Sequence, residues 1–428
     1  VNYGYMGRYL LTLSARYDGS SRLAEGHKWV LFPSAALAWR ISDEPFMKDL
    51  VWLDNLKLRV GYGKTGNSAV SPYQTKGQLA LRHYVFNNGS SEYIGYAPSV
   101  MANDQLTWET TDQWNVGVDF GFLKNRINGT VEFYLQNTKD LLLKRQLPVV
   151  SGFSSVMSNV GSTRNKGIEI TLNTRNIMNR NFTWSTDLTF SANKEEIVEL
   201  YNGKTDDVGN LWFIGQPIDV YYNYKKIGIW QNTENDLAEM AKFNEKGANF
   251  KPGSIRLEDV DGDYKITEED KQILGSVRPK FVASMVNNFE FKGFDLSVFL
   301  YASVGGLLRN NIEFMEKPGR GNTVKVDYWT STNPTNAFPR PSVDVEKLDY
   351  ISTLGYDKAD FLRIRNITLG YTLPEMWSKK VLMDKIRIYL SANNPAIFTN
   401  FTGIDPEGAN GRTAPSYSTW MFGINLSM

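Results

Sequence analysis

The sequence predicts an all-β protein, an antiparallel transmembrane β-barrel with about twelve strands in this chain, and two patterns carry that prediction. The first is alternation: over 114–122 every even position is large and apolar, whereas the odd positions are small or polar. Alternation with a period of two places one set of side chains on each face of a strand. The second is the spacing of the strands, because short and long connections alternate along the chain.

The same alternation recurs through all 428 residues. Large apolar residues occupy every second position, as in Phe294, Leu296, Val298 and Leu300, and again in Trp420, Phe422, Ile424 and Leu426. Strands are expected at 8–17, 28–41, 56–65, 110–122, 125–137, 166–175, 182–193, 280–291, 293–303, 361–372, 385–394 and 416–428. Most are long enough to cross a bilayer as barrel strands, which takes about 9–11 residues. In 361–372 the apolar phase slips between Ile364 and Ile367, which predicts a β-bulge.

The connections separate into two classes. The short ones are 42–55, 123–124, 176–181, 292 and 373–384, and the long ones are 18–27, 66–109, 138–165, 194–279, 304–360 and 395–415. Outer-membrane barrels have short periplasmic turns and long extracellular loops. We therefore expect 66–109, 194–279 and 304–360 outside the cell and the C-terminus on the periplasmic side. A soluble β-sandwich gives no reason for this alternation, and a propeller would show a repeat of about 40–50 residues.

Composition is consistent with a barrel. Aromatic residues make up 13% of the chain, and Trp39, Trp114, Trp184 and Trp420 stand near strand ends, where membrane-interface girdles lie. The mean hydropathy of −0.36 suits strands in which every second residue is apolar, and no apolar run is long enough for a transmembrane helix. A net charge of +1 gives no sign of a nucleic-acid partner. The absence of cysteine excludes disulfides and cysteine-zinc sites.

One segment, 259–270, has the spacing of a calcium-binding loop. Its candidate metal ligands are Asp259, Asp261, Asp263, Lys265 (through its carbonyl), Thr267 and Asp270. Two positions depart from the pattern: Tyr264 stands where the sharp turn favours glycine, and Asp270 is shorter than the usual glutamate. The two interpretations are a structural Ca²⁺ that stiffens the longest loop and an acidic, solvated turn without metal. We expect no other cofactor.

No catalytic constellation stands out. The G-x-G-x-x-G match at 61–66 is followed by 67–72, which is typical of a loop and not of the helix that a dinucleotide site requires. His27 and His83 are the two histidines, and neither belongs to a triad pattern. We therefore expect a protein that is not an enzyme. Charged residues on the polar side of the strands are expected to face a water-filled or plugged lumen: Arg59, Glu132, Glu169, Asp187, Asp295 and Arg387.

Several motifs spread over nearly the whole chain carry a resemblance to one known family. They are 9–22, which contains Asp18-Gly-Ser-Ser-Arg22, then 32–42 with Phe46-Met47, 56–67, 106–111, 137–142, 159–162, 165–169, 259–270 and 361–366. In this order they resemble the SusC/RagA family of TonB-linked outer-membrane proteins (TonB-dependent receptors). The similarity covers the C-terminal barrel portion of that family.

The resemblance implies a bacterial outer-membrane transporter with a plugged barrel of the 22-stranded class. Residues 1–428 would supply about half of the strands, with the N-terminal plug and the TonB-contacting segment absent from them. It also implies a SusD-like surface lipoprotein as partner, energy from the TonB complex, and import of oligosaccharide (glycan) or peptide nutrients, with the substrate itself not readable from the sequence. Two alternatives stay open: a self-contained twelve-stranded porin-like channel and a secreted all-β binding protein.

Aromatic residues in the long loops have two interpretations. Trp212, Tyr221, Tyr222, Trp230 and Trp329 could stack on sugar rings, or they could pack the loops against each other or face the lipoprotein. Packing and partner contact are favoured over sugar stacking.

Overall fold

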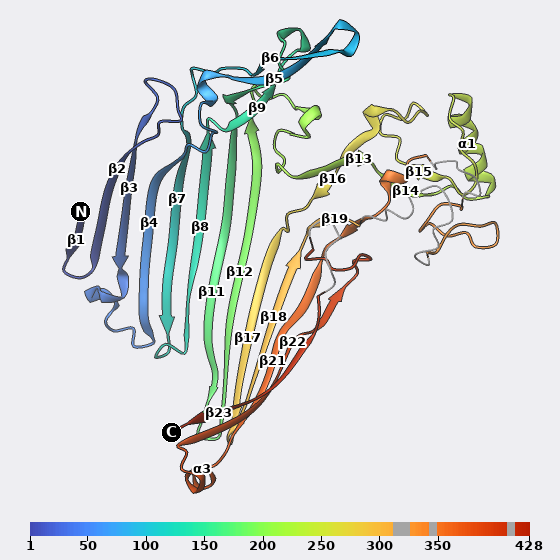
Figure 1. The fold of residues 1–428 in the computed structure, drawn as a ribbon. Coiled ribbons are helices and arrows are strands. Elements are labelled where there is room, and N and C mark those ends of the chain that lie inside the picture. Colours follow the sequence, from blue (N-terminus) through green and yellow to red (C-terminus); the bar gives the residue numbers. More distant parts are fainter. Residues whose placement is uncertain (311–325, 342–348, 409–415) are drawn as a thin grey trace.

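The computed structural model describes residues 1–310, 326–341, 349–408 and 416–428. Thirteen strands form one antiparallel sheet in chain order, which curves through space in Figure 1. They are β1 (Asn2–Tyr5), β2 (Tyr9–Gly19), β3 (Trp29–Arg40), β4 (Leu53–Asn67), β7 (Glu109–Phe122), β8 (Ile127–Lys139), β11 (Ser162–Met178), β12 (Phe182–Glu199), β17 (Phe281–Phe291), β18 (Phe294–Val304), β21 (Phe361–Thr372), β22 (Lys385–Thr399) and β23 (Thr419–Ser427).

All twelve predicted strands are present, and several extend further than the sequence indicated. The predicted number of about twelve strands is confirmed, and the sheet contains one more, β1, which has four residues and is too short to show alternation. The predicted bulge is confirmed: the pairing of β21 with β22 shifts register between Ile364 and Asn366. Twelve of the thirteen strands are therefore readable from local sequence.

The alternation of short and long connections is confirmed. The short ones lie together at one end of the sheet, and the connection 373–384 there contains the helix α3 (Glu375–Ser378). The long ones lie at the other end and carry their own elements (Figure 1): β5 (Gln78–Phe86), β6 (Ser91–Val100), β9 (Leu142–Gln146), β10 (Ser155–Asn159), β13 (Val220–Tyr224), β14 (Lys226–Ile229), α1 (Glu234–Glu245), β15 (Ile255–Leu257), β16 (Lys271–Ser276), β19 (Leu307–Arg309) and β20 (Tyr356–Lys358). Within the described ranges, no helix combines the length and the apolar character that a membrane crossing requires.

One face of the sheet has the dimensions of a membrane-facing surface. Near the short-turn end of β2 and β3, the rings of Tyr9 and Trp39 stack with their centroids 6.3 Å apart. Near the long-loop end, Tyr17 and Trp29 stack at 5.3 Å. Tyr9 and Tyr17 are eight positions apart on the same face, which is roughly 27 Å along an extended strand. Aromatic pairs therefore border an apolar band close to the height of about 25 Å found in outer-membrane barrels.

The opposite face is polar, as the sequence predicted. Strand register places all six predicted lumen-facing charges on this face. Arg59 donates to both carboxylate oxygens of Asp119 at 3.0 Å and lies 3.3 Å from Glu132. Arg387 Nε donates to Asp295 at 2.9 Å. Ion pairs between adjacent strands and across one intervening strand thus fix these polar side chains to the wall itself.

Gly167 provides a test of how closely this lining packs. A Cβ built at Gly167 would lie 2.5 Å from the Tyr134 ring and 2.7 Å from the carbonyl oxygen of Ala192. We expect Gly167→Ala to destabilise the sheet by about 1–3 kcal/mol, as overpacking does. Gly63→Ala is the matched control, because its nearest neighbour, the Cβ of Ser34, would be 3.7 Å away. The check is the midpoint of heat-induced unfolding in detergent, and equal midpoints for the two variants would contradict the packing argument.

Candidate functional site in the extracellular loops

The two longest loops fold together at the long-loop end of the sheet. Residues from 200–280 and from 305–360 share one apolar core, formed by Ile229, Ile255, Leu257, Trp329, Ile351 and Leu354. The indole N–H of Trp329 donates to the side-chain oxygen of Gln231 at 2.8 Å, which joins the two loops through a polar contact. Segments about one hundred residues apart in sequence therefore build one extracellular unit.

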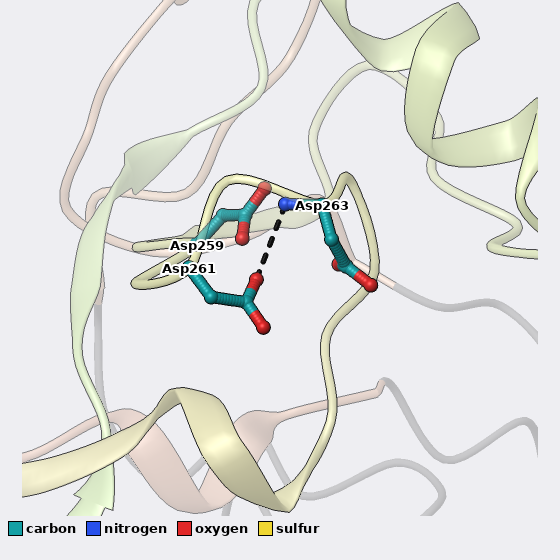
Figure 2. Close-up of side chains that lie close together, drawn as sticks. All are labelled: Asp259, Asp261 and Asp263. Atoms are coloured by element: carbon teal, nitrogen blue, oxygen red, sulfur yellow. Dashed lines mark hydrogen bonds between the residues drawn. The ribbon is translucent and has the colours of Figure 1, made fainter.

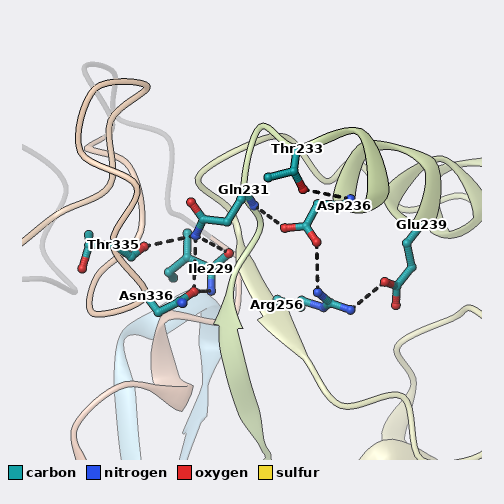
Figure 3. A network of polar contacts seen from close by, with 8 residues as sticks. All are labelled: Ile229, Gln231, Thr233, Asp236, Glu239, Arg256, Thr335 and Asn336. Carbon is teal, nitrogen blue, oxygen red and sulfur yellow. Dashed lines mark hydrogen bonds and ion pairs between the residues drawn. The ribbon is translucent and has the colours of Figure 1, made fainter.

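A second apolar cluster supports α1. Trp230, Met240, Phe243 and Phe250 form it. The guanidinium of Arg256 lies 4.4 Å from the Trp230 ring. It also pairs with Asp236 at 3.2 Å and with Glu239 at 2.6 Å (Figure 3). The side chain of Thr233 accepts a hydrogen bond from the backbone N–H of Asp236 and caps the helix. The helix is thereby fixed to the strands below it by apolar contacts and by charge.

These cores decide the interpretation of two loop aromatics. Trp230 is 1% exposed and Trp329 is 9% exposed, so both pack the loops and present no open face to a sugar ring. Tyr221 and Tyr222 are partly buried: Tyr221 packs edge-on against Tyr356, and Tyr222 lies against Phe213. Trp212 is also partly exposed. The preferred interpretation, packing, is confirmed for Trp230 and Trp329.

The predicted metal loop brings three of its candidate ligands together (Figure 2). Each of Asp259, Asp261 and Asp263 offers a carboxylate oxygen within 4.8 Å of the others. Tyr264 adopts the left-handed conformation, with φ of 62°, at the position where the pattern favours glycine. Its backbone N–H donates to Asp259 at 2.9 Å, which secures the bend. The tyrosine is therefore compatible with the turn, at the modest conformational cost of a non-glycine residue in this region.

The other candidate ligands are arranged differently. Asp270 is 1% exposed, and its two carboxylate oxygens accept hydrogen bonds from the backbone N–H groups of Val260 at 2.8 Å and Thr267 at 2.7 Å. It therefore serves as a cap for the turn at 267–270. The side chains of Lys265 and Thr267 are exposed. Three exposed or half-exposed carboxylates suit a hard cation, and the cation stays a prediction.

Sequence reasoning missed an ion-pair cluster between β21 and the connection 400–418. Arg363 and Asp405 pair at 2.7 Å, and their side chains are 3% and 7% exposed. Arg363 also pairs with Glu407 at 2.7 Å, and Glu407 pairs with Arg365. Burial raises the pKa of Asp405, but hydrogen bonds from the Ser416 hydroxyl, the Glu407 N–H and Arg363 hold it below its ordinary value. Two arginines close together in 361–366 could have indicated an ion-pair cluster, but their acidic partners lie about forty residues away in the sequence.

Residues 1–395 match the family profile described as "TonB dependent receptor-like, beta-barrel". The chain belongs to this family. It is 33% identical to TonB-dependent receptor P3 of Formosa agariphila over 458 residues, which cover 100% of this chain and 44% of that protein. It is 32% identical to TonB-dependent receptor SusC of Bacteroides thetaiotaomicron over 448 residues, which cover 100% of this chain and 43% of SusC.

A solved structure of the RagAB peptide transporter gives a TM-score of 0.80 at 26% identity, and the match covers 99% of this chain and 46% of that one. This TonB-dependent receptor chain thus spans less than half the length of the relatives and the structure that it matches. The SusC/RagA resemblance and the outer-membrane location are confirmed. Members of the family are transporters and not enzymes.

Both structural alternatives lose their support. The family is one of outer-membrane barrels, so the secreted binding protein is wrong. Among the described residues β1 and β23 do not pair with each other, and the sheet has thirteen strands. A closed twelve-stranded channel is therefore not what this chain forms in the structure.

Proposed function

We propose that this chain supplies part of the barrel wall and the extracellular loops of a TonB-dependent nutrient importer. The observation that carries the proposal is the thirteen-stranded sheet, which has a membrane-facing band on one side, a polar lining on the other and a packed loop cluster at one end. Its likeness to SusC and to the RagAB transporter supports the same function. The importer takes up oligosaccharides or peptides, draws energy from the TonB complex and works with a SusD-like surface lipoprotein.

The hairpin β5–β6 supports an extracellular partner. Leu81 and Ile94 lie on one of its faces with Tyr96, and Tyr84 pairs with Tyr93 on the other, all of them exposed. An isolated two-stranded hairpin is marginally stable in water. Exposed apolar surface of this kind is characteristic of a protein-protein contact. A lipoprotein seated on the extracellular side would bury it.

The import proposal is tested by uptake. Cells that express the receptor with its lipoprotein should accumulate labelled oligosaccharide or peptide only when TonB is functional. Replacing 78–100 by a short Gly-Ser turn should release the lipoprotein on purification and reduce uptake. A matched control shortens 142–159, the hairpin β9–β10, in the same way. Uptake that persists without TonB would contradict the energy-coupled mechanism.

We propose in addition that the loop 259–270 binds one Ca²⁺ weakly through Asp259, Asp261 and Asp263. Their convergence supports this, and a dissociation constant on the order of 10⁻⁴–10⁻³ M is typical of extracellular modules. We expect Ca²⁺ to protect 194–279 against protease, and Asp261→Asn with Asp263→Asn to abolish the protection.

Glu269→Gln is the control for the calcium experiment, because this side chain is exposed and lies outside the three-carboxylate group. Terbium luminescence, titrated against Ca²⁺, measures binding directly. If the double variant binds terbium as well as the parent protein does, the three carboxylates are not the ligands.

A further inference from the structure

A cavity of about 550 Å³ lies inside the loop cluster, between β14, β16 and β20. Its wall is formed by 272–274 of β16, by 353–357, and by Lys226, Leu307 and Phe338 among others. This volume is within the range of about 300–1,000 Å³ found for small-ligand pockets. The cavity belongs to the loop cluster at the long-loop end of the sheet, the end that we expect outside the cell.

Lys226 places a poorly compensated positive charge at this cavity. Its ammonium donates to the carbonyl oxygen of Ala337 at 2.5 Å, its one hydrogen bond among the described residues, whereas an ammonium can donate three. Burial lowers the pKa of Lys226, and the nearby Asp357 partly opposes that shift without lying at ion-pair distance in the described structure. The neighbouring Lys225 also lines the cavity, but its ammonium is paired with Glu258 at 3.0 Å. Lys226 therefore has donor capacity left for an anion.

The rest of the cavity wall is mixed. Ile273, Leu274, Leu307 and Leu354 form an aliphatic part of it, and polar side chains form the remainder, among them Gln272, Thr353, Tyr356, Asp357 and Thr402. An ammonium beside the aliphatic part is complementary to an anion that carries an apolar group one or two bonds away. The last residue of a peptide has this form, because its carboxylate and its side chain leave the same carbon atom. A uronic-acid sugar also has a carboxylate, but it would place hydroxyl groups against the aliphatic wall.

Backbone edges along the cavity fit an extended ligand. Within the described residues, β16 pairs with β13 alone and β20 pairs with β19 alone, so each strand keeps one open edge. Consecutive residues of both strands line the cavity. Extended peptides are commonly bound by hydrogen bonds to such open strand edges.

We propose that this cavity receives the C-terminal carboxylate and the last apolar side chain of an imported peptide. This inference rests on the proposed import function and narrows its substrate class to peptides with a free C-terminus. Lys226 binds the carboxylate, and the wall around Leu307 binds the side chain.

The test uses the natively produced receptor, purified in detergent together with its partners. The probes are the peptide Ala-Ala-Leu with a free C-terminus, the same peptide as its amide, and trigalacturonate. We expect the free acid to bind at least about tenfold more tightly than the amide, a difference of about 1.4 kcal/mol. Lys226→Met should abolish that difference and Lys226→Arg should retain it. Lys251→Met is the control, because this exposed lysine of the same loop is not part of the cavity wall, and it should leave the difference unchanged.

Three results would overturn the proposal. The first is equal affinity of the parent protein for acid and amide, and the second is no measurable binding of either peptide. The third is tighter binding of trigalacturonate that depends on Lys226, which would assign the cavity to acidic sugars. Uptake by cells that carry the same variants, measured with and without functional TonB, distinguishes failure of the peptide subsite from failure of the import function. If uptake depends on TonB while the acid and the amide bind equally, the importer stands and the peptide subsite is wrong.

Discussion

Asp405→Ala is expected to destabilise the attachment of 400–408 to β21 by about 3 kcal/mol, at the low end of the range for breaking a buried ion pair. The substitution leaves the guanidinium of Arg363, which is 3% exposed, without the partner at 2.7 Å. Glu407 still lies 2.7 Å from Arg363 and limits the loss. Hydrogen exchange of 400–408 in the purified receptor measures the effect.

A control and a double variant make this prediction specific. Arg365→Met removes a pair whose side chains are 30% and 26% exposed, and it should cost less than about 1 kcal/mol. Arg363→Met combined with Asp405→Leu removes both buried charges and should cost less than Asp405→Ala alone. If the amide hydrogens of 400–408 exchange faster in the double variant than in Asp405→Ala, the two charges themselves stabilise the attachment of 400–408 to β21.

The pH dependence of the same pair follows from its pKa. Hydrogen bonds and Arg363 hold the pKa of Asp405 below its ordinary value, although burial opposes this. A carboxylate with a lowered pKa stabilises the fold fully above its unfolded pKa of about 4, and the contribution is lost as the pH falls through the folded value. We therefore expect the difference between Asp405→Ala and the parent protein to be constant between pH 8 and pH 5. A difference that shrinks within this window would show that Asp405 titrates there.

Trp230→Ala is expected to destabilise the extracellular loop unit by about 3–5 kcal/mol. Its ring packs against Phe243 and Phe250 with centroids 5.9 Å and 6.0 Å apart, and the guanidinium of Arg256 covers it at 4.4 Å. The effect should be local, because the cluster is separate from the membrane-spanning sheet. Protease sensitivity of 200–280 should therefore rise while the unfolding midpoint of the sheet stays unchanged.

Trp212→Ala is the matched control for Trp230→Ala. Trp212 is a tryptophan of the same loop, but it is partly exposed and belongs to none of the apolar clusters found in the described residues. Its loss should change protease sensitivity little, since substitutions outside a core are usually mild. Equal sensitivity of the two variants would show that the cluster does not hold the loop unit together.

For the candidate metal loop, the sequence predicted that Asp259, Asp261 and Asp263 lie close together, which the structure shows, but it did not predict the position of Asp270. The spacing alone was enough to predict that Asp259, Asp261 and Asp263 share one turn, because Asp side chains two residues apart in a tight loop face the same centre. Spacing could not show that Asp270 turns inward to cap backbone N–H groups, because that depends on the burial of the whole loop. The left-handed Tyr264 shows in the same way that a local rule can be overridden by surrounding contacts.

The sequence by itself determined the strands, their faces, the bulge near Ile364 and the two classes of connection. Each of these follows from local alternation or from lengths counted along the chain. Only the tertiary structure decided the joining of the two longest loops, the burial of Trp230 and Trp329, and the pairing of Arg363 with Asp405. These contacts join residues from about ten to about 125 positions apart, and no local pattern specifies which side chain will meet an arginine or fill an apolar core.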